Sequence, residues 1–91
     1  MEEVRELLIM DAAAEKLGRR SISDAEAEQL LGNAYLTVRN PATGEERRLL
    51  IGRTDGGRAL TLVIERTIEP SAWLVVTGWT ATAPERRMLG D

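Results

Sequence analysis

Arginine is the residue type in this chain best suited to act on phosphate groups. Eleven of the twelve basic residues are arginines, and Lys16 is the one lysine. A guanidinium group donates parallel hydrogen bonds that match the oxygens of phosphate or carboxylate. The same excess of arginine over lysine also arises from the codon usage of a GC-rich genome. Composition therefore points to phosphate chemistry without assigning it to particular residues.

The residue types that are absent limit the chemistry further. The chain has no histidine and no cysteine, which excludes disulfides and thiolate metal sites and removes the commonest general base. We expect no metal and no cofactor. The net charge is −3, of which residues 1–40 carry −3 and residues 41–91 carry zero. An acidic balance, with a pI of about 5.0, argues against non-specific binding of nucleic acid.

Length and hydropathy predict one domain. A chain of 91 residues buries only about 60–65% of its unfolded surface, too little for two independent cores. No apolar run approaches the roughly 20 residues of a membrane span. Glu2 and Glu3 stand where a signal peptide would carry positive charge. We therefore expect a single cytoplasmic domain over residues 1–91 that does not contact a membrane.

Two helices are predicted in the first third of the chain. Apolar residues recur at helical spacing over residues 2–18, which Gly18 could end. An alternative is that Asp11 caps a shorter helix that follows an extended segment over 7–10. Ser23 and Glu26 have the spacing of a capping box, which predicts a second helix over 24–31.

After residue 32 the hydrophobic period changes from helical to alternating, which is typical of strands. Short turns, among them the glycine-rich segment 55–57, favour antiparallel pairing because parallel neighbours need long crossovers. The predicted fold class is α+β: two N-terminal helices on one face of a four-stranded antiparallel sheet, then a short C-terminal helix. The strands are expected at 35–39, 48–53, 59–66 and 72–80, and the last helix at 83–89.

The second face of this sheet is too apolar for an ordinary solvent face. The residues predicted there are Leu49, Ile51, Val63 and Val75. Trp73 and Trp79 could add to them, because their spacing of six places both on one face of a regular strand. Either the C-terminal helix covers these side chains or a partner does. We expect a partner protein, with a second copy of the chain as the alternative.

The segment 45–58, followed by an apolar strand, resembles the centre of the BrnT-type toxins of the RelE superfamily. That pattern has an E-x-R start, an I-G pair and a glycine hairpin with arginine. The segments 76–82 and 84–87 fall where the family has a later strand and an R-E-R helix start, and 15–23 is similar to its approach to the second helix. The resemblance implies the toxin half of a bacterial type II toxin–antitoxin pair, which cleaves RNA, blocks translation and is neutralised by an antitoxin.

The resemblance also suggests site residues. Arg47 and Arg58 match its arginine positions and would stabilise charge on the cleaved phosphate, while Glu46 would act as the base or orient Arg47. Substrate phosphates would be contacted by Lys16, Arg86 and Arg87. We expect Arg47 and Arg58 to share one cationic patch with Lys16 or Arg86. Each of these side chains could instead be a solvated surface charge, and Glu46 an ordinary ion-pair partner.

Three departures from the family pattern leave other functions open. The family histidine has no counterpart, Trp79 stands in place of the fourth-strand arginine, and Leu89 replaces the aromatic residue that often closes the last helix. The alternative function is a catalytically weakened member of the RelE fold that acts through protein–protein contacts. A third possibility is an unrelated small α+β domain with an evenly acidic surface.

Overall fold

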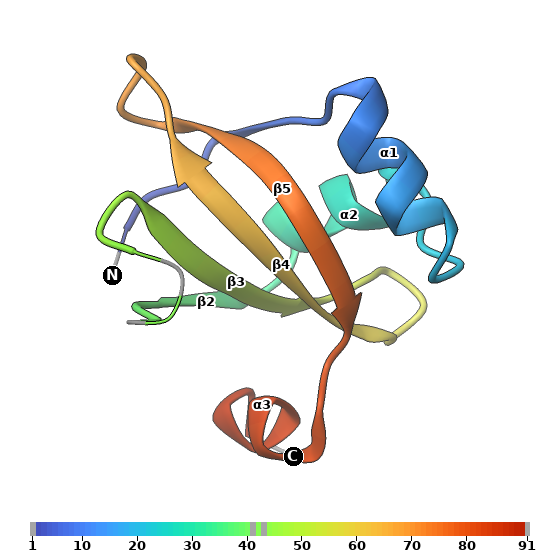
Figure 1. Cartoon of the computed structure of the whole chain (residues 1–91). Coiled ribbons are helices and arrows are strands. Elements are labelled where there is room, and N and C mark those ends of the chain that lie inside the picture. The colour runs from blue at the N-terminus through green and yellow to red at the C-terminus, as the bar shows by residue number, and fades with distance from the viewer. Residues whose placement is uncertain (1, 41, 43, 91) are drawn as a thin grey trace.

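The computed structural model describes residues 2–40, 42 and 44–90 of the chain (Figure 1). The helices are α1 (Asp11–Gly18), α2 (Asp24–Gln29), the 3₁₀ turn η1 (Leu30–Gly32) and α3 (Ala83–Met88). The strands are β1 (Glu6–Leu8), β2 (Tyr35–Val38), β3 (Arg47–Arg53), β4 (Ala59–Arg66) and β5 (Ala72–Thr80). The α+β class is confirmed, and the predicted strand bounds differ from those observed by no more than one residue.

The sheet has five strands and is mixed, so the prediction of four antiparallel strands is wrong in two respects. Its order is β1-β5-β4-β3-β2, and β1 pairs with β5 in parallel. The additional strand comes from the N-terminal segment, where Leu7 lies opposite Trp73. The shorter-helix alternative is therefore the one observed, although Met10 rather than Asp11 occupies the N-cap position. A three-residue strand is too short to show an alternating period, which is why it read as part of a helix.

The ends of the helices follow the chemistry of their caps. Ser23 and Glu26 form the predicted capping box at the start of α2. Thr82 and Glu85 form a second capping box at the start of α3. Gly18 is the last residue of α1, and the positive φ that reverses the chain falls on Ser21, at +58°.

The two tryptophans lie on opposite faces of the sheet, which corrects the prediction that they share one. The pairing of β4 with β5 shifts between Val63 and Ile64, so that Val63 lies opposite Thr77 and Ile64 opposite Val75. The extra residue of this β-bulge reverses the alternation along β5. Trp73 consequently packs under the N-terminal helices and Trp79 under α3.

The two faces of the sheet bury two separate cores. The first core lies under α1 and α2, on one side of the sheet in Figure 1, and the predicted placement of both helices on one face is confirmed. It contains Val4, Leu7, Ala13, Leu17, Ile22, Ala27, Leu30, Leu50, Leu60, Leu62, Ile64, Trp73 and Val75. The second core lies on the opposite face, toward α3, and contains Leu49, Ile51 and Val63, with Val38, Val76, Trp79 and Leu89 partly buried against them.

The existence of the second core overturns the argument that the sheet leaves an apolar remainder for a partner. Val63 is 3% exposed and Val75 2%, each covered within the chain itself. The bulge moves Val75 under the N-terminal helices, and α3 lies over the other face. A partner therefore has to be argued from other features.

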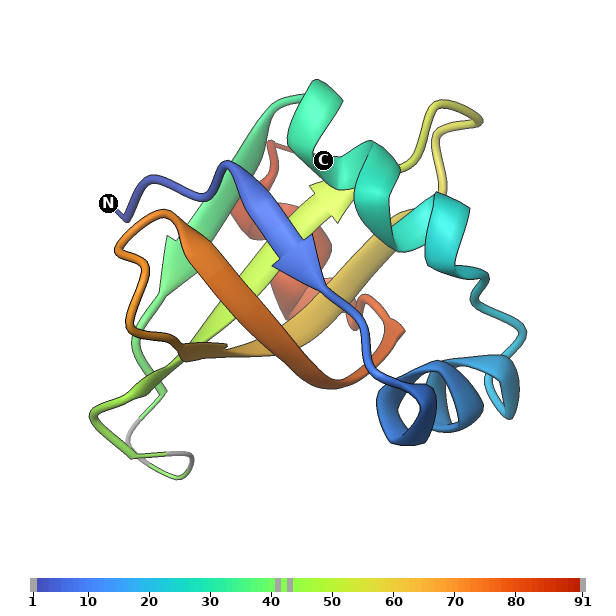
Figure 2. The ribbon, with the colours of Figure 1, turned by 90° about the horizontal axis from the view of Figure 1, so that it is seen from above.

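The N-terminal segment runs across one end of the first core, close to β2. The Glu2 amide donates to the Thr37 hydroxyl at 3.0 Å, and the Val4 amide lies 3.2 Å from the Tyr35 hydroxyl. Figure 2, seen from above, shows this segment passing from β1 toward β2, the strands at the two edges of the sheet. The sheet is thus curled, and residues 2–4 bridge its edges at one end.

Candidate functional site

Arg47 opens β3 on the face toward α3. Its side chain lies on the same face of the strand as those of Leu49 and Ile51, and its Nε donates to Glu65 Oε1 at 2.8 Å on the neighbouring strand. Both side chains are somewhat more than one-third exposed. This cross-strand ion pair adds little to stability, but it gives Arg47 a counter-ion.

Arg58 lies at the other end of the same hairpin and holds other segments together. Its Nη1 donates to the Ser21 carbonyl at 2.6 Å, and its Nη2 donates to the Arg20 carbonyl at 3.2 Å and the Thr80 hydroxyl at 3.1 Å. Nη1 also lies 3.4 Å from both carboxylate oxygens of Glu26. The guanidinium therefore ties the loop after α1 to the start of α2 and the end of β5.

Arg47 and Arg58 do not form the shared phosphate site that the sequence predicts. Arg47 pairs with Glu65, whereas Arg53, at the far end of β3, pairs with Ala59, so the two arginines lie about 20 Å apart along the hairpin. Their side chains also turn to opposite faces of the sheet. Strand pairing thus separates two arginines that the family motif predicts to share one site.

Glu46 belongs to the Arg47 end of the hairpin. Its side chain is 71% exposed, and a carboxylate oxygen lies 3.8 Å from Nε of Arg66. The three predicted catalytic side chains are therefore not assembled: Glu46 and Arg47 lie at one end, and Arg58 at the other.

A cationic patch lies at the end of the molecule near Arg58. We define it as Lys16, Arg19 and Arg20, at the C-terminal end of α1. With Thr77 of β5 they line a hollow of about 480 Å³. All three are exposed, and Arg19 pairs with Glu15 one turn earlier. Within the described part of the chain, the side chains of Lys16 and Arg20 have no hydrogen-bond or ion-pair partner, so their charges face solvent.

The cationic patch adjoins Arg58 and, through the end of β5, Arg86. Arg58 contacts the Arg20 carbonyl and the Thr80 hydroxyl, and Arg86 Nη1 donates to the next carbonyl, that of Ala81, at 3.0 Å. Arg58 therefore contacts the backbone of one patch residue, Arg20, while Arg86 bonds to the residue that follows Thr80. Arg87 is exposed on α3.

No family model, curated protein or solved structure is similar enough to this chain to assign it to a family. Its function must therefore be argued from its own residues and from the resemblance described above.

Two absences hold for the described residues. No three Asp or Glu side chains there are grouped as a metal ion would require. No helix in the same part of the chain is long and apolar enough to cross a membrane.

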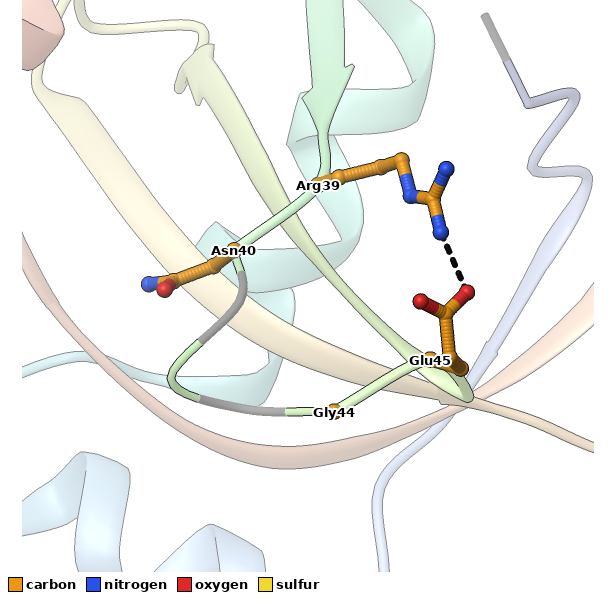
Figure 3. A pocket seen from close by; sticks show the side chains of 4 residues that line it. All are labelled: Arg39, Asn40, Gly44 and Glu45. Atoms are coloured by element: carbon orange, nitrogen blue, oxygen red, sulfur yellow. Dashed lines mark hydrogen bonds and ion pairs between the residues drawn. The ribbon is translucent and has the colours of Figure 1, made fainter.

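A second hollow lies beside the loop between β2 and β3 (Figure 3). It measures about 520 Å³ and is lined by Arg39, Asn40, Gly44 and Glu45. Arg39 and Glu45 form an ion pair across it, as the dashed line in Figure 3 marks, and both side chains are mostly exposed. One solvated ion pair beside an amide offers no nucleophile, so this hollow carries no functional assignment.

Glu85 is an interacting residue that the sequence argument did not single out. Its Oε1 accepts from the Thr61 hydroxyl at 2.9 Å, the Trp79 indole at 3.0 Å and the Thr82 amide at 2.8 Å. Partial burial raises the pKa of this carboxyl, but the hydrogen bonds from Thr82, Trp79 and Thr61 outweigh it and hold the pKa below 4.5. The spacing Thr82-x-x-Glu85 is the sequence signal that could have found it.

Arg48 was also missed, although it is the most buried charged side chain described. It is 7% exposed, and its Nη1 donates to the carbonyls of Glu45 at 2.7 Å and Arg47 at 2.8 Å. Nη2 lies 3.3 Å from Glu2 Oε1. The available signal was its spacing of two from Leu50 along β3, because residues two apart on a strand share a face and Leu50 lies in the first core.

Proposed function

We propose that this chain is a toxin-type domain whose target is RNA and which contacts RNA phosphates through the cationic patch. The observation that carries the proposal is the pair of exposed, unpartnered charges of Lys16 and Arg20 beside the hollow at Thr77. Phosphate contacts by lysine and arginine supply most of the affinity of sequence-independent nucleic-acid binding. The resemblance of segment 45–58 to the BrnT-type toxins supports RNA as the target.

The local charge is consistent with this role although the whole chain is acidic. The patch contributes three positive charges, and among the described residues Glu15 is the one carboxylate that pairs with it. Arg58 lies next to the patch but donates to two carbonyls, a hydroxyl and Glu26. We assign it a supporting role, in which it fixes the loop that carries Arg20.

Binding is better supported than cleavage. Cleavage by an internal 2′-hydroxyl needs a base, cations at the phosphorane and an acid within reach of one phosphate. Glu46 and Arg47 lie far from the patch, and Glu26, which lies near it, is a weak base because its pKa is lowered by the Ser23 amide and by Arg58 in spite of its desolvation. RNA cleavage remains a second candidate, for which Arg58 and Arg86 would be the cations, because they bond to the consecutive residues Thr80 and Ala81 at the end of β5.

The resemblance extends the proposal to a partner, an antitoxin encoded by a neighbouring gene. Such a partner would neutralise the domain by covering the cationic patch or by binding elsewhere on it. An acidic segment would complement the patch electrostatically. A second copy of the chain is the alternative partner.

The test is induced expression in a bacterial host with and without the product of the neighbouring gene. We expect growth arrest that the neighbour relieves, and loss of arrest in Lys16→Ala/Arg20→Ala. Arg5→Ala is a control for Arg20→Ala, because Arg5 is an exposed arginine that pairs with Glu3 away from the patch. The absence of any arrest by the folded wild-type chain would contradict the toxin function.

An RNA cleavage assay separates the two candidates. If the chain binds without cutting, purified protein shifts RNA in a gel and leaves its length unchanged. If it cuts, Arg86→Ala should slow cleavage more than Arg47→Ala or Glu46→Gln, because Arg86 lies at the same end as the patch.

A further inference from the structure

At the end of the first core that lies away from the cationic patch, two arginines contact the same carboxylate oxygen. Glu2 Oε1 accepts from Arg66 Nη2 at 2.9 Å and lies 3.3 Å from Arg48 Nη2. The side chain of Arg48 is 9% exposed, that of Arg66 38% and that of Glu2 32%. This arrangement, which we name the arginine cradle, is far from the cationic patch and plays no part in the function proposed above.

The guanidinium groups of the cradle are fixed by contacts other than Glu2. Arg48 is anchored by the carbonyls of Glu45 and Arg47. Arg66 lies over the ring of Trp73, 5.0 Å from its centroid, in a cation–π contact. Removal of the Glu2 carboxylate would therefore leave two oriented cations and not two relaxed side chains.

The cradle opens into a hollow of about 360 Å³ lined by Glu2, Thr37, Arg39 and Arg48. The Thr37 hydroxyl accepts from the Glu2 amide, which leaves its own proton available to a ligand. Arg39 also lines the hollow but is paired with Glu45, so the groups that would face anything replacing the Glu2 side chain are the guanidiniums of Arg48 and Arg66 and the Thr37 hydroxyl.

We infer that the arginine cradle is a phosphate-binding site in which the Glu2 carboxylate is an internal occupant that competes with the ligand. The carboxylate uses a single oxygen for both arginines. A phosphate group carries more negative charge and several oxygens, so that each guanidinium could bind an oxygen of its own. The phosphate could be free or the terminal 5′-phosphate of an RNA.

Calorimetric titration of the full chain with inorganic phosphate tests the inference. Glu2→Gln removes the competing charge, and Glu3→Gln is the matched control, because Glu3 is the adjacent residue and pairs with Arg5 in solvent. If the internal carboxylate occupies the site about nine-tenths of the time, Glu2→Gln should bind phosphate about tenfold more tightly than the wild type. Glu3→Gln should bind as the wild type does.

A second variant assigns the binding to the cradle. Glu2→Gln/Arg66→Gln should lose the gain, and Arg66 is chosen over Arg48 because its partial exposure makes a folding defect less severe. Equal binding by Glu2→Gln and Glu3→Gln, or a gain that survives loss of Arg66, would overturn the inference. Circular dichroism of each variant checks that the fold is kept.

The source of the phosphate is decided by short RNAs that differ at one end. Glu2→Gln could raise the affinity for a 5′-phosphorylated RNA, relative to its 5′-hydroxyl form, by more than it raises the affinity for inorganic phosphate. That result assigns the site to RNA ends. A gain with inorganic phosphate alone assigns it to free phosphate. No gain with any of the three would contradict the site.

Discussion

The two faces of the sheet are covered in different ways. Under α1 and α2 the first core packs thirteen buried side chains drawn from both helices, four strands and the N-terminal segment. Under α3 the second core has three, and α3 itself has no buried residue. One face is stabilised by extensive apolar packing, whereas the cover of the other combines a small apolar contact through Leu89 with the hydrogen bonds of Glu85. The cationic patch belongs to the helix α1, which carries two side chains of the first core, Ala13 and Leu17.

The largest effect is expected where the first core has no room. A Cβ at Gly78 would lie 2.6 Å from Leu62 Cδ2 and 3.0 Å from both Leu17 Cδ2 and the Thr61 carbonyl oxygen. We expect Gly78→Ala to lower the free energy of unfolding by about 1–3 kcal/mol, the usual cost of overpacking. Thermal denaturation measures it.

Gly18→Ala is the control for that substitution, since a Cβ at Gly18 meets nothing within 4 Å and alanine favours the helix. Equal stability of the two alanine variants would show that α1 is not seated as closely on β5 as described.

The next effect concerns Arg58, which joins the loop after α1 to α2 and β5. Arg58→Ala removes donors to the carbonyls of Ser21 and Arg20 and to the Thr80 hydroxyl. We expect a loss of about 1–2 kcal/mol by urea denaturation, because hydrogen bonds from charged donors contribute more than neutral ones. Arg87→Ala, on an exposed arginine of α3, should change stability by less than about 0.5 kcal/mol. A neutral Arg58→Ala would mean that Arg58 is a free surface charge after all.

A smaller and more local effect is expected at Glu85. Glu85→Ala removes the capping-box carboxylate and the acceptor of the Trp79 indole, and we expect about 1 kcal/mol of destabilisation. Because Trp79 lies under α3, its fluorescence should change with the loss of the helix. Glu85→Gln keeps an acceptor oxygen and should retain part of the stability; equal losses in the two variants would show that the charge alone matters.

The two tryptophans report on the two faces separately as the pH is lowered. Burial and the hydrogen bonds from Thr82, Trp79 and Thr61 leave the pKa of Glu85 in the folded protein below its ordinary value, so its contribution to stability is present above that ordinary value and is lost as the pH falls through the folded pKa. The Trp79 indole N–H, bonded to Glu85, should shift in NMR spectra over this acidic range. The Trp73 indole nitrogen is buried without a described partner and should shift much less. Parallel shifts of both signals would indicate global unfolding, not release of α3.

The sequence predicts some features of the fold better than others. Local signals were sufficient where a short motif determines the backbone, as in the Ser23 capping box and the glycine turn at residues 55–57. They failed where pairing between distant segments determines the structure. The examples are the three-residue β1 and the bulge that places Trp73 and Trp79 on opposite faces. No periodicity in one strand reports the register of its neighbour.

The site shows the same division. Lys16 was predicted as a phosphate ligand and does face solvent, but its neighbours Arg19 and Arg20 were not singled out. Arg58 looked like a phosphate ligand in sequence, whereas in the structure its donors point to the carbonyls of a loop 37 residues away. The type of a residue limits the roles that its side chain can take, and the partners that the fold places around it determine which role it has.

The central claim is that the cationic patch binds RNA phosphates, and the salt dependence of RNA affinity tests it most directly. The measurement compares the wild type with Lys16→Ala/Arg20→Ala on a single-stranded RNA over a range of salt concentrations. We predict weaker binding by the double variant, a slope of log affinity against log salt that is shallower by about 1.4, as expected for two lost contacts, and an unchanged melting temperature. The same affinity and slope in both proteins would contradict the account.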